Sequence, residues 1–162
     1  MKKSIVIICS GDYGYKKCRK IFGLNKDKEL KGRKISISES DGLTIQGVKA
    51  GPGKIQSASA TQLVINEFNP DYVIDVGVSG SLTDDIDIFT IITGLRSYEY
   101  DICPTNELTE MPENLISETV FEVDKNKEIM DNFINKELSD NTKVTLGNIA
   151  SGEENVDNTV FR

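Results

Sequence analysis

The sequence predicts an α/β fold in which strands and helices alternate around a sheet. Residues 43–49 alternate apolar and polar side chains as a half-buried strand does, and residues 50–53 break the pattern with Ala-Gly-Pro-Gly. A helix is expected over residues 54–68, and the Asn-Pro pair that follows it ends the helix. Residues 72–76 form the next strand. This order of strand, crossover helix and strand predicts two parallel strands of one sheet.

Two loops of small residues follow these strands, at residues 50–53 and 77–80. The carboxyl ends of parallel strands share one edge of the sheet, which is where open α/β sheets bind ligands. Glycine lets backbone N–H groups approach a ligand, and the start of the helix at Lys54 adds a partial positive charge. The loops predict a site for a polar small molecule, although glycines also serve simply to make tight turns.

The helix over residues 54–68 follows a 3.6-residue period only loosely. We expect it to bury one apolar stripe against the sheet. That stripe consists of Ile55, Ala58, Leu63, Ile65 and Phe68.

The amino-terminal part adds a third loop to the same edge. Residues 4–9 form a buried strand, and a small-residue loop over residues 10–15 leads into a helix over residues 15–22. Residues 23–34 are polar and turn-rich. A strand over the following residues is separated from the strand at residue 43 by Asp-Gly, which predicts a β-hairpin.

The carboxyl-terminal half is less regular. An acidic loop leads into a strand over residues 88–93, and a long loop is expected over residues 94–122. An amphipathic helix follows over residues 124–138. A strand over residues 143–149 then brings residues 151–155 to the same carboxyl edge.

The composition predicts one globular domain over residues 1–162. The chain is 38% hydrophobic and 28% charged, and it is long enough for a proper core. Its first apolar run is too short for a signal peptide, and no run approaches the length of a membrane helix. We therefore expect a cytoplasmic protein with no membrane partner.

Charge is distributed unevenly along the chain. The net charge is −7, yet residues 1–34 contain 11 of the 19 Lys and Arg residues and 3 of the 26 Asp and Glu residues. A basic segment of this kind attracts an anionic ligand or nucleic acid, or is the solvated face of a short helix. The acidic balance of the whole chain favours the solvated face and argues against a nucleic-acid partner.

The chain contains no histidine, which excludes catalysis by an imidazole base. Cys9, Cys18 and Cys103 are too far apart for a metal or disulfide framework and are expected to be free thiols. We expect no bound metal and no cofactor. Acid and base chemistry therefore falls to carboxylates, or less readily to tyrosine.

Several short motifs, in order, resemble one enzyme family. They are Gly51-Pro52-Gly53-Lys54-Ile55, Ala60-Thr61-Gln62-Leu63, Pro70-Asp71, Val76-Gly77-Val78-Ser79-Gly80-Ser81-Leu82 and Ala150-Ser151-Gly152-Glu153. Together they are similar to the nucleoside phosphorylase and nucleosidase family, particularly its methylthioadenosine/S-adenosylhomocysteine nucleosidase branch.

The resemblance implies a three-layer fold with a mixed central sheet flanked by helices. It also implies cleavage of the N-glycosidic bond of a purine nucleoside, by water or by phosphate, in methionine salvage. Such chemistry needs an acid near the purine, a carboxylate that positions water and groups that hold the ribose. The implied partners are a small nucleoside and a second copy of the chain, as a homodimer.

Carried over by position, the resemblance gives two catalytic candidates and a set of substrate-binding candidates. The catalytic candidates are the available carboxylates Asp12 and Glu153. The substrate-binding candidates are Gly51, Pro52, Gly53, Val78, Ser79, Gly80, Ser151, Gly152 and Asn155.

The chain departs from the family pattern at several positions. The family glutamate that handles water falls near Tyr13 or Gly14, and the aromatic residue that stacks on the purine falls near Asn155. Where phosphorylases have an arginine that holds phosphate, this chain has Asp75, which would repel phosphate. Hydrolysis is thus the expected reaction, although Asp75 fits a structural role equally.

The sequence stops before the family's ribose-binding Met-Glu pair and its catalytic Asp. We expect a fold that lacks the last strands of the family, with an exposed sheet edge that a second copy covers.

Three functions remain open. One is a purine nucleosidase acting on methylthioadenosine or S-adenosylhomocysteine. Another is a catalytically impaired relative that binds a nucleoside or only dimerises. A weaker third is a flavodoxin-like nucleotide-binding domain that uses residues 10–14 as a phosphate loop.

Overall fold

A computed structural model describes residues 2–99, 120–122 and 142–152. It divides into two compact units, residues 1–79 and residues 80–162. The expectation of a single domain stays a prediction.

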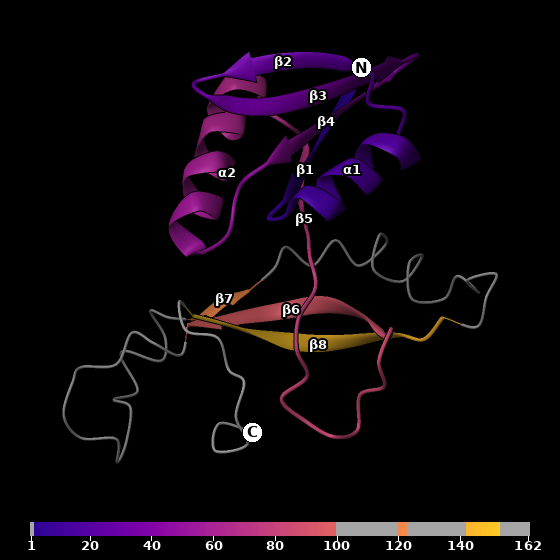
Figure 1. Ribbon diagram of the computed structural model, residues 1–162, viewed down its shortest axis with the longest axis vertical. Helices are drawn as coiled ribbons and strands as arrows, with labels where there is room; N and C mark the ends of the chain where they lie inside the picture. Colours follow the sequence, from indigo (N-terminus) through magenta and orange to yellow (C-terminus); the bar gives the residue numbers. More distant parts are fainter. Residues whose placement is uncertain (1, 100–119, 123–141, 153–162) are drawn as a thin grey trace. The chain divides into compact units, whose positions relative to one another are not determined.

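The first unit contains a five-stranded mixed sheet with the order β2-β3-β4-β1-β5 (Figure 1). Its strands are β1 (Lys3–Cys9), β2 (Lys26–Leu30), β3 (Arg33–Ser40), β4 (Leu43–Lys49) and β5 (Tyr72–Val76). β1 lies between β4 and β5 and is parallel to both, whereas β3 pairs antiparallel with both β2 and β4. The strands before and after the crossover helix, β4 and β5, are parallel members of one sheet, as predicted. They do not pair with each other, because β1 lies between them.

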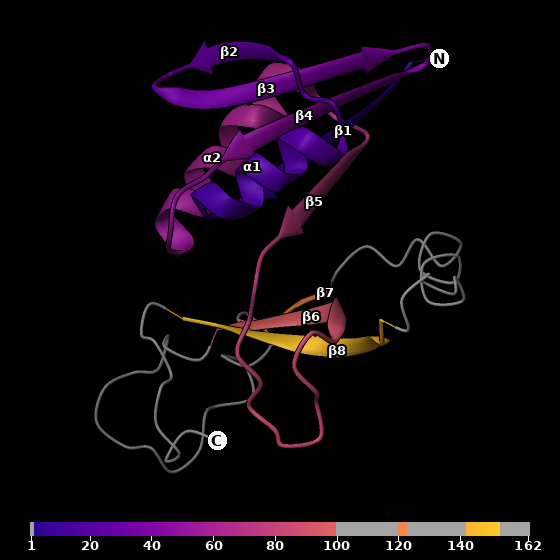
Figure 2. The same ribbon diagram turned by 45° about the vertical axis from the view of Figure 1, so that its right-hand side comes forward.

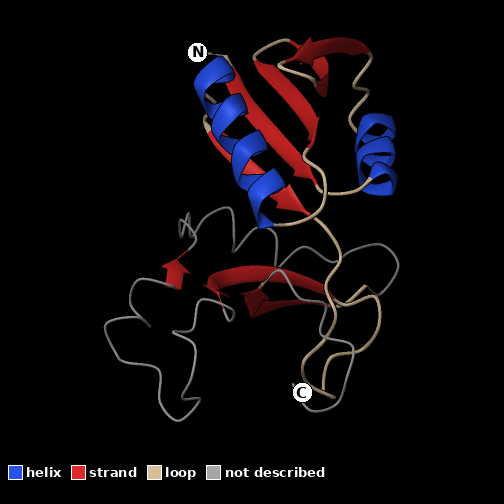
Figure 3. Ribbon diagram, turned by 60° about the vertical axis from the view of Figure 1, so that its left-hand side comes forward, coloured by secondary structure: helices blue, strands red, loops and turns tan. Residues whose placement is uncertain are grey.

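Two helices cover opposite faces of this sheet: α1 (Asp12–Ile21) and α2 (Lys54–Phe68) (Figure 3). Alternate residues of β1 supply the two cores, because successive side chains of a strand point to opposite faces. Val6 and Ile8 pack with Ala60 and Val64 of α2. On the other face, Ile7 and Cys9 belong to a cluster with Tyr15, Cys18 and Leu24. The three-layer arrangement of helix, mixed sheet and helix is confirmed.

Two hairpins join the antiparallel strands. Asp41 and Gly42 connect β3 to β4, as predicted, with Gly42 at φ +78°. β2 lies within residues 23–34, which the sequence marks as polar and turn-rich and where no strand was predicted. Lys31 and Gly32 connect β2 to β3, and both have positive φ.

The predicted bounds of α2 are confirmed. Of its predicted buried stripe, Phe68 packs against the core, but the prediction is wrong at Ile55, Ala58 and Ile65. Ala60 and Val64 are fully buried, whereas Ile55 is 77% exposed and Ala58 and Ile65 are also exposed. The buried face follows positions 60, 64 and 68, one residue per turn of helix. The helix ends where Asn69 adopts a left-handed conformation before Pro70.

α1 begins at Asp12, three residues earlier than predicted. Asp12, Tyr13 and Gly14 are therefore helical and not part of a loop. An acidic residue in the first turn of a helix is favoured by the helix dipole, which explains the early start.

The motif at Pro70-Asp71 docks the edge strand β5 onto β1. The backbone N–H of Ser4 donates to Oδ2 of Asp71 at 2.7 Å, and the N–H of Asp71 donates to the Ser4 carbonyl at 2.9 Å. β5 is the outer strand of the sheet (Figure 2).

The second unit contains a three-stranded sheet of β6 (Ile91–Glu99), β7 (Val120–Glu122) and β8 (Val144–Ser151), in the order β7-β6-β8. β6 and β8 are parallel, with an irregularity between Gly94 and Arg96. The expected strand over residues 88–93 is displaced, because Phe89 has φ +71° and the strand starts at Ile91 and continues to Glu99.

The strand predicted over residues 143–149 is confirmed as β8. The helix predicted over residues 124–138 lies outside the described residues. Among the described residues, no helix is long and apolar enough to cross a membrane.

Candidate functional site

The carboxyl ends of β1, β4 and β5 lie at one edge of the first sheet, as predicted. β1 ends at Cys9, β4 at Lys49 and β5 at Val76, and the parallel registers place these ends side by side. The N–H of Ala50 donates to the Cys9 carbonyl at 2.9 Å, which ties the loop after β4 to the end of β1. This edge is the candidate site.

The loop after β4 brings three predicted substrate-binding residues to the edge: Gly51, Pro52 and Gly53. Gly51 and Gly53 have φ values of +96° and +87°, which favour glycine. α2 starts immediately after this loop, at Lys54. Backbone N–H groups and the positive end of the helix dipole are thus available to an electronegative part of a ligand.

The predicted catalytic residue Asp12 lies at the same edge, in the first turn of α1. Its Oδ1 is 2.6 Å from Nζ of Lys49, the last residue of β4. The hydrogen bond and charge of Lys49, helped by Lys16 and Lys34, hold the pKa of Asp12 below its usual range. At neutral pH Asp12 is ionised, so it can accept a hydrogen bond from water but cannot serve as an acid.

Asp75 lies one residue from the end of β5 and is paired in register with Ile8 of β1. Loss of contact with water raises the pKa of its carboxyl, against a smaller opposing effect of a hydrogen bond from the Val76 backbone. Its charge also makes a small contribution to the raised pKa of the Cys9 thiol. Asp75 thus adds negative charge, not an anion-binding group, to this part of the edge.

The loop after β5 contributes Val78 and Ser79, both exposed. Gly77 lies against the loop after β1, because a Cβ on Gly77 would be 3.9 Å from Oγ of Ser10. The loops after β1 and β5 are therefore neighbours. Gly80 is the first residue of the second unit.

The remaining predicted residues belong to the second unit or lie outside the described residues. Ser151 ends β8 and Gly152 follows it, both in the second unit. Glu153 and Asn155 lie outside the described residues. Their roles stay predictions.

Sequence reasoning missed Lys49 and the network that anchors α1. The Tyr15 hydroxyl lies 2.7 Å from Oγ of Ser36, which donates to Oδ1 of Asp27 at 2.6 Å, and Arg19 of α1 is 2.9 Å from the same carboxylate. The sequence signal for Lys49 is its place as the last residue of a strand before a glycine-containing loop. The network had no such signal, because its members come from three separate elements.

Cys9 and Cys18 are buried free thiols in contact with each other. Burial, with a smaller contribution from Cys18, raises the pKa of Cys9 to about 12, and burial also raises the pKa of Cys18. These thiols are structural and not nucleophilic at neutral pH. Within the described ranges, no cluster of three or more His, Cys, Asp or Glu side chains could hold a metal ion.

Comparison with known proteins decides the family. The family model described as the Phosphorylase superfamily matches residues 4–154. The chain belongs to this superfamily.

Its curated relatives in the comparison are named nucleosidases. The 5'-methylthioadenosine/S-adenosylhomocysteine nucleosidase of Buchnera aphidicola subsp. Acyrthosiphon pisum is 31% identical over 88 residues, 54% of this chain and 38% of that protein. The enzyme of the same name from Bacillus subtilis is 27% identical over 70 residues, 42% of this chain and 30% of that protein. The chain thus matches well under half the length of these relatives.

Solved structures share the fold. The native futalosine hydrolase of Helicobacter pylori has a TM-score of 0.81 at 21% identity, covering 99% of this chain and 71% of that one. The Helicobacter pylori structure named MTAN has a TM-score of 0.80 at 22% identity, covering 98% of this chain and 71% of that one. The expected phosphorylase/nucleosidase-like fold is confirmed.

Proposed function

We propose that this protein is a purine nucleosidase that hydrolyses the N-glycosidic bond of nucleosides of the methylthioadenosine or S-adenosylhomocysteine type. The observation that carries the proposal is the ionised Asp12 beside the Gly51–Gly53 loop, at the ligand-binding edge of a Phosphorylase superfamily fold. The names of its curated relatives support the same reaction.

The chemistry that the edge can perform follows from charge. As the purine leaves, positive charge develops on the ribose, and an ionised carboxylate stabilises that charge and orients the attacking water. Asp12 suits this role because its pKa is depressed by Lys49. Gly51, Pro52, Gly53, Val78 and Ser79 would hold the ribose. Gly80, Ser151, Gly152 and Asn155 stay substrate-binding candidates, and Glu153 stays a catalytic candidate.

Hydrolysis is favoured over phosphorolysis. A phosphate nucleophile needs a cation near the loop after β5, and the side chain there is the carboxyl of Asp75. Water needs no such counter-charge.

A homodimer is part of the proposal. β5 is an edge strand of the first unit, and its apolar residues Val73, Ile74 and Val76 are 40%, 46% and 47% exposed. Apolar surface on a strand edge favours a covering partner, and a second copy is the simplest one. We also place the protein in the cytoplasm, in methionine salvage.

The alternative is a catalytically impaired relative that binds a nucleoside or only dimerises. It is supported by the departures at Tyr13 and Gly14, where the family glutamate is absent.

To separate these possibilities, the purified chain is incubated with methylthioadenosine, with and without phosphate, and free adenine is measured by chromatography. We expect adenine release that does not depend on phosphate. No release from a sample with a cooperative unfolding transition would contradict the enzyme and leave the binding-only relative. Release only in the presence of phosphate would identify a phosphorylase.

A further inference from the structure

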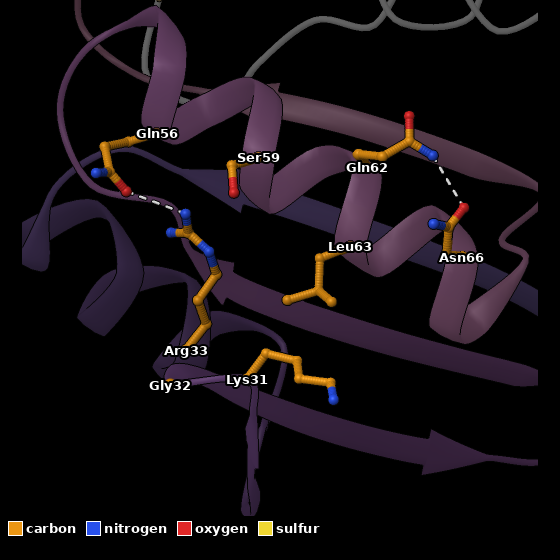
Figure 4. A pocket seen from close by; sticks show the side chains of 8 residues that line it. All are labelled: Lys31, Gly32, Arg33, Gln56, Ser59, Gln62, Leu63 and Asn66. Atoms are coloured by element: carbon orange, nitrogen blue, oxygen red, sulfur yellow. Dashed lines mark hydrogen bonds between the residues drawn. The ribbon is translucent and has the colours of Figure 1, made fainter.

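A cavity of about 630 Å³ lies next to the loop after β4, between α2 and the turn that joins β2 to β3 (Figure 4). It is an open groove and contains no residue assigned to the proposed reaction. The lining residues are Lys31 and Gly32 from the turn, Arg33 from the start of β3, and Gln56, Ser59, Gln62, Leu63 and Asn66 from α2.

The charged side chains that line this groove are all cationic. They are Lys31 and Arg33, and no carboxylate is among the lining residues, although the chain has a net charge of −7. The acidic residue next to Asn66 on α2, Glu67, is held 2.7 Å from Nζ of Lys28. The groove is therefore locally positive on an acidic protein, which favours an anionic ligand.

Hydrogen bonds orient the amide groups of the groove as donors. The Oε1 of Gln56 accepts from Nη2 of Arg33 at 3.0 Å, which leaves the Gln56 amide N–H groups available. The Oδ1 of Asn66 accepts from Nε2 of Gln62 at 2.9 Å, which leaves the Asn66 amide N–H groups available. Figure 4 shows both bonds, with Ser59 and Leu63 between them. Donors and cations without a carboxylate match the needs of an oxyanion.

Lys31 occupies an unfavourable backbone position. Its φ is +49°, in the left-handed region, at the first position of a two-residue hairpin turn where Asn, Asp or Gly is preferred. A β-turn alone gives no reason for a lysine there. A residue that breaks a local rule in this way points to a functional demand on its side chain.

We propose that this groove binds a small metabolite that carries an oxyanion, either a phosphate ester or a carboxylate. Lys31 supplies the charge, and the amides of Gln56 and Asn66 donate hydrogen bonds. Arg33 also donates to the Ala50 carbonyl. An anion that contacts the Arg33 guanidinium would therefore change the environment of Gly51, the residue after Ala50 in the candidate site.

Titration of the ¹⁵N-labelled chain with inorganic phosphate, and separately with citrate, tests the proposal at constant ionic strength set with chloride. We expect saturable shifts of the side-chain amide signals of Gln56 and Asn66 and a smaller shift at the Gly51 N–H. Stronger binding of phosphate would identify a phosphate ester as the ligand, and stronger binding of citrate a carboxylate.

Lys31→Asn is the informative variant, because asparagine suits the left-handed turn and the fold should be retained or stabilised. We expect binding to weaken by about tenfold or more, as the loss of one charge-assisted hydrogen bond implies. Lys20→Gln, on the exposed side of α1 across the sheet, removes the same charge and should leave binding unchanged.

Asn66→Asp is a second variant of nearly constant size that places a carboxylate in the groove, and it should abolish binding. Two results would overturn the proposal: no saturable shift in the wild-type chain, or equal weakening by Lys31→Asn and Lys20→Gln. Neither depends on nucleosidase activity, so the test is independent of the proposed function.

Discussion

At the scale of single residues, the contact between Asp12 and Lys49 sets the chemistry of the candidate site. A carboxylate in the first turn of a helix is already favoured by the helix dipole, and the ammonium at 2.6 Å adds a direct ion pair. Both effects keep Asp12 charged. Because the Asp12 side chain is largely exposed, the ion pair lowers the pKa of Asp12 but adds little to the free energy of unfolding.

Replacement of Asp12 by Asn should reduce kcat/KM for methylthioadenosine by roughly 10²-fold or more, the usual size of a positioned acid–base contribution. The neutral amide cannot stabilise positive charge on the ribose. Steady-state kinetics measures the effect, with Asp41→Asn at the opposite edge of the sheet as the control. Equal activity of the two variants would remove Asp12 from the mechanism.

Replacement of Lys49 by Gln should raise the pKa of Asp12, because Lys49 is the main cause of its depression. A carboxylate is active when ionised, so the acidic limb of the pH profile of kcat/KM should move to higher pH. An unchanged acidic limb would show that another group controls it.

At the scale of elements, α1 is attached to the sheet by a tight contact at Gly47 and by the network of Tyr15, Ser36 and Asp27. A Cβ on Gly47 would lie 3.6 Å from Sγ of Cys18 in α1 and 2.6 Å from Cδ1 of the buried Leu24, which would have to shift. Since α1 carries Asp12, these contacts also fix the position of the candidate site.

Gly47→Ala should destabilise the chain by about 1–3 kcal/mol, because Leu24 must move in a packed core. Gly11→Ala is the control: no atom lies within 4 Å of its added Cβ, so its cost should be limited to about 0.5–1 kcal/mol for the poorer N-cap of α1. Urea unfolding measures both. Equal effects would show that the Leu24 contact has relaxed.

Ser36→Ala should cost more than Tyr15→Phe. Ser36 is fully buried and bridges Tyr15 to Asp27, so its loss leaves the Tyr15 hydroxyl without its partner, at about 1–3 kcal/mol. Tyr15→Phe leaves the Ser36–Asp27 bond intact and should cost about 1 kcal/mol. Urea unfolding ranks the two, and the reverse order would contradict the assigned bridge.

At the scale of the whole molecule, the sequence predicted the parallel core of the first unit well. Strand alternation, the small-residue loops and the Asn-Pro and Asp-Gly signals gave β1, β4, α2 and β5 with nearly correct bounds. These signals are local, so a single sequence contains them. The placement of Gly51 and Asp12 at one edge followed from the parallel order alone.

What the sequence did not predict depends on contacts between distant residues. β2 is mostly charged and exposed, and it is a strand because β3 offers a partner through the Lys31-Gly32 turn. The buried face of α2 is chosen by the sheet beneath it, not by its weak periodicity. The ion pair at Lys49 and the polar network at Ser36 need the fold before they can be recognised.

We infer that the carboxyl edge of the first sheet binds a purine nucleoside. An NMR titration of the ¹⁵N-labelled chain with methylthioadenosine tests this inference, because it follows backbone amides and does not require turnover. We expect saturable shifts at Gly11, Gly51, Gly53 and Gly77, with none at Gly42 in the turn at the opposite edge. Shifts centred on Gly42, or no shifts in a folded sample, would contradict it.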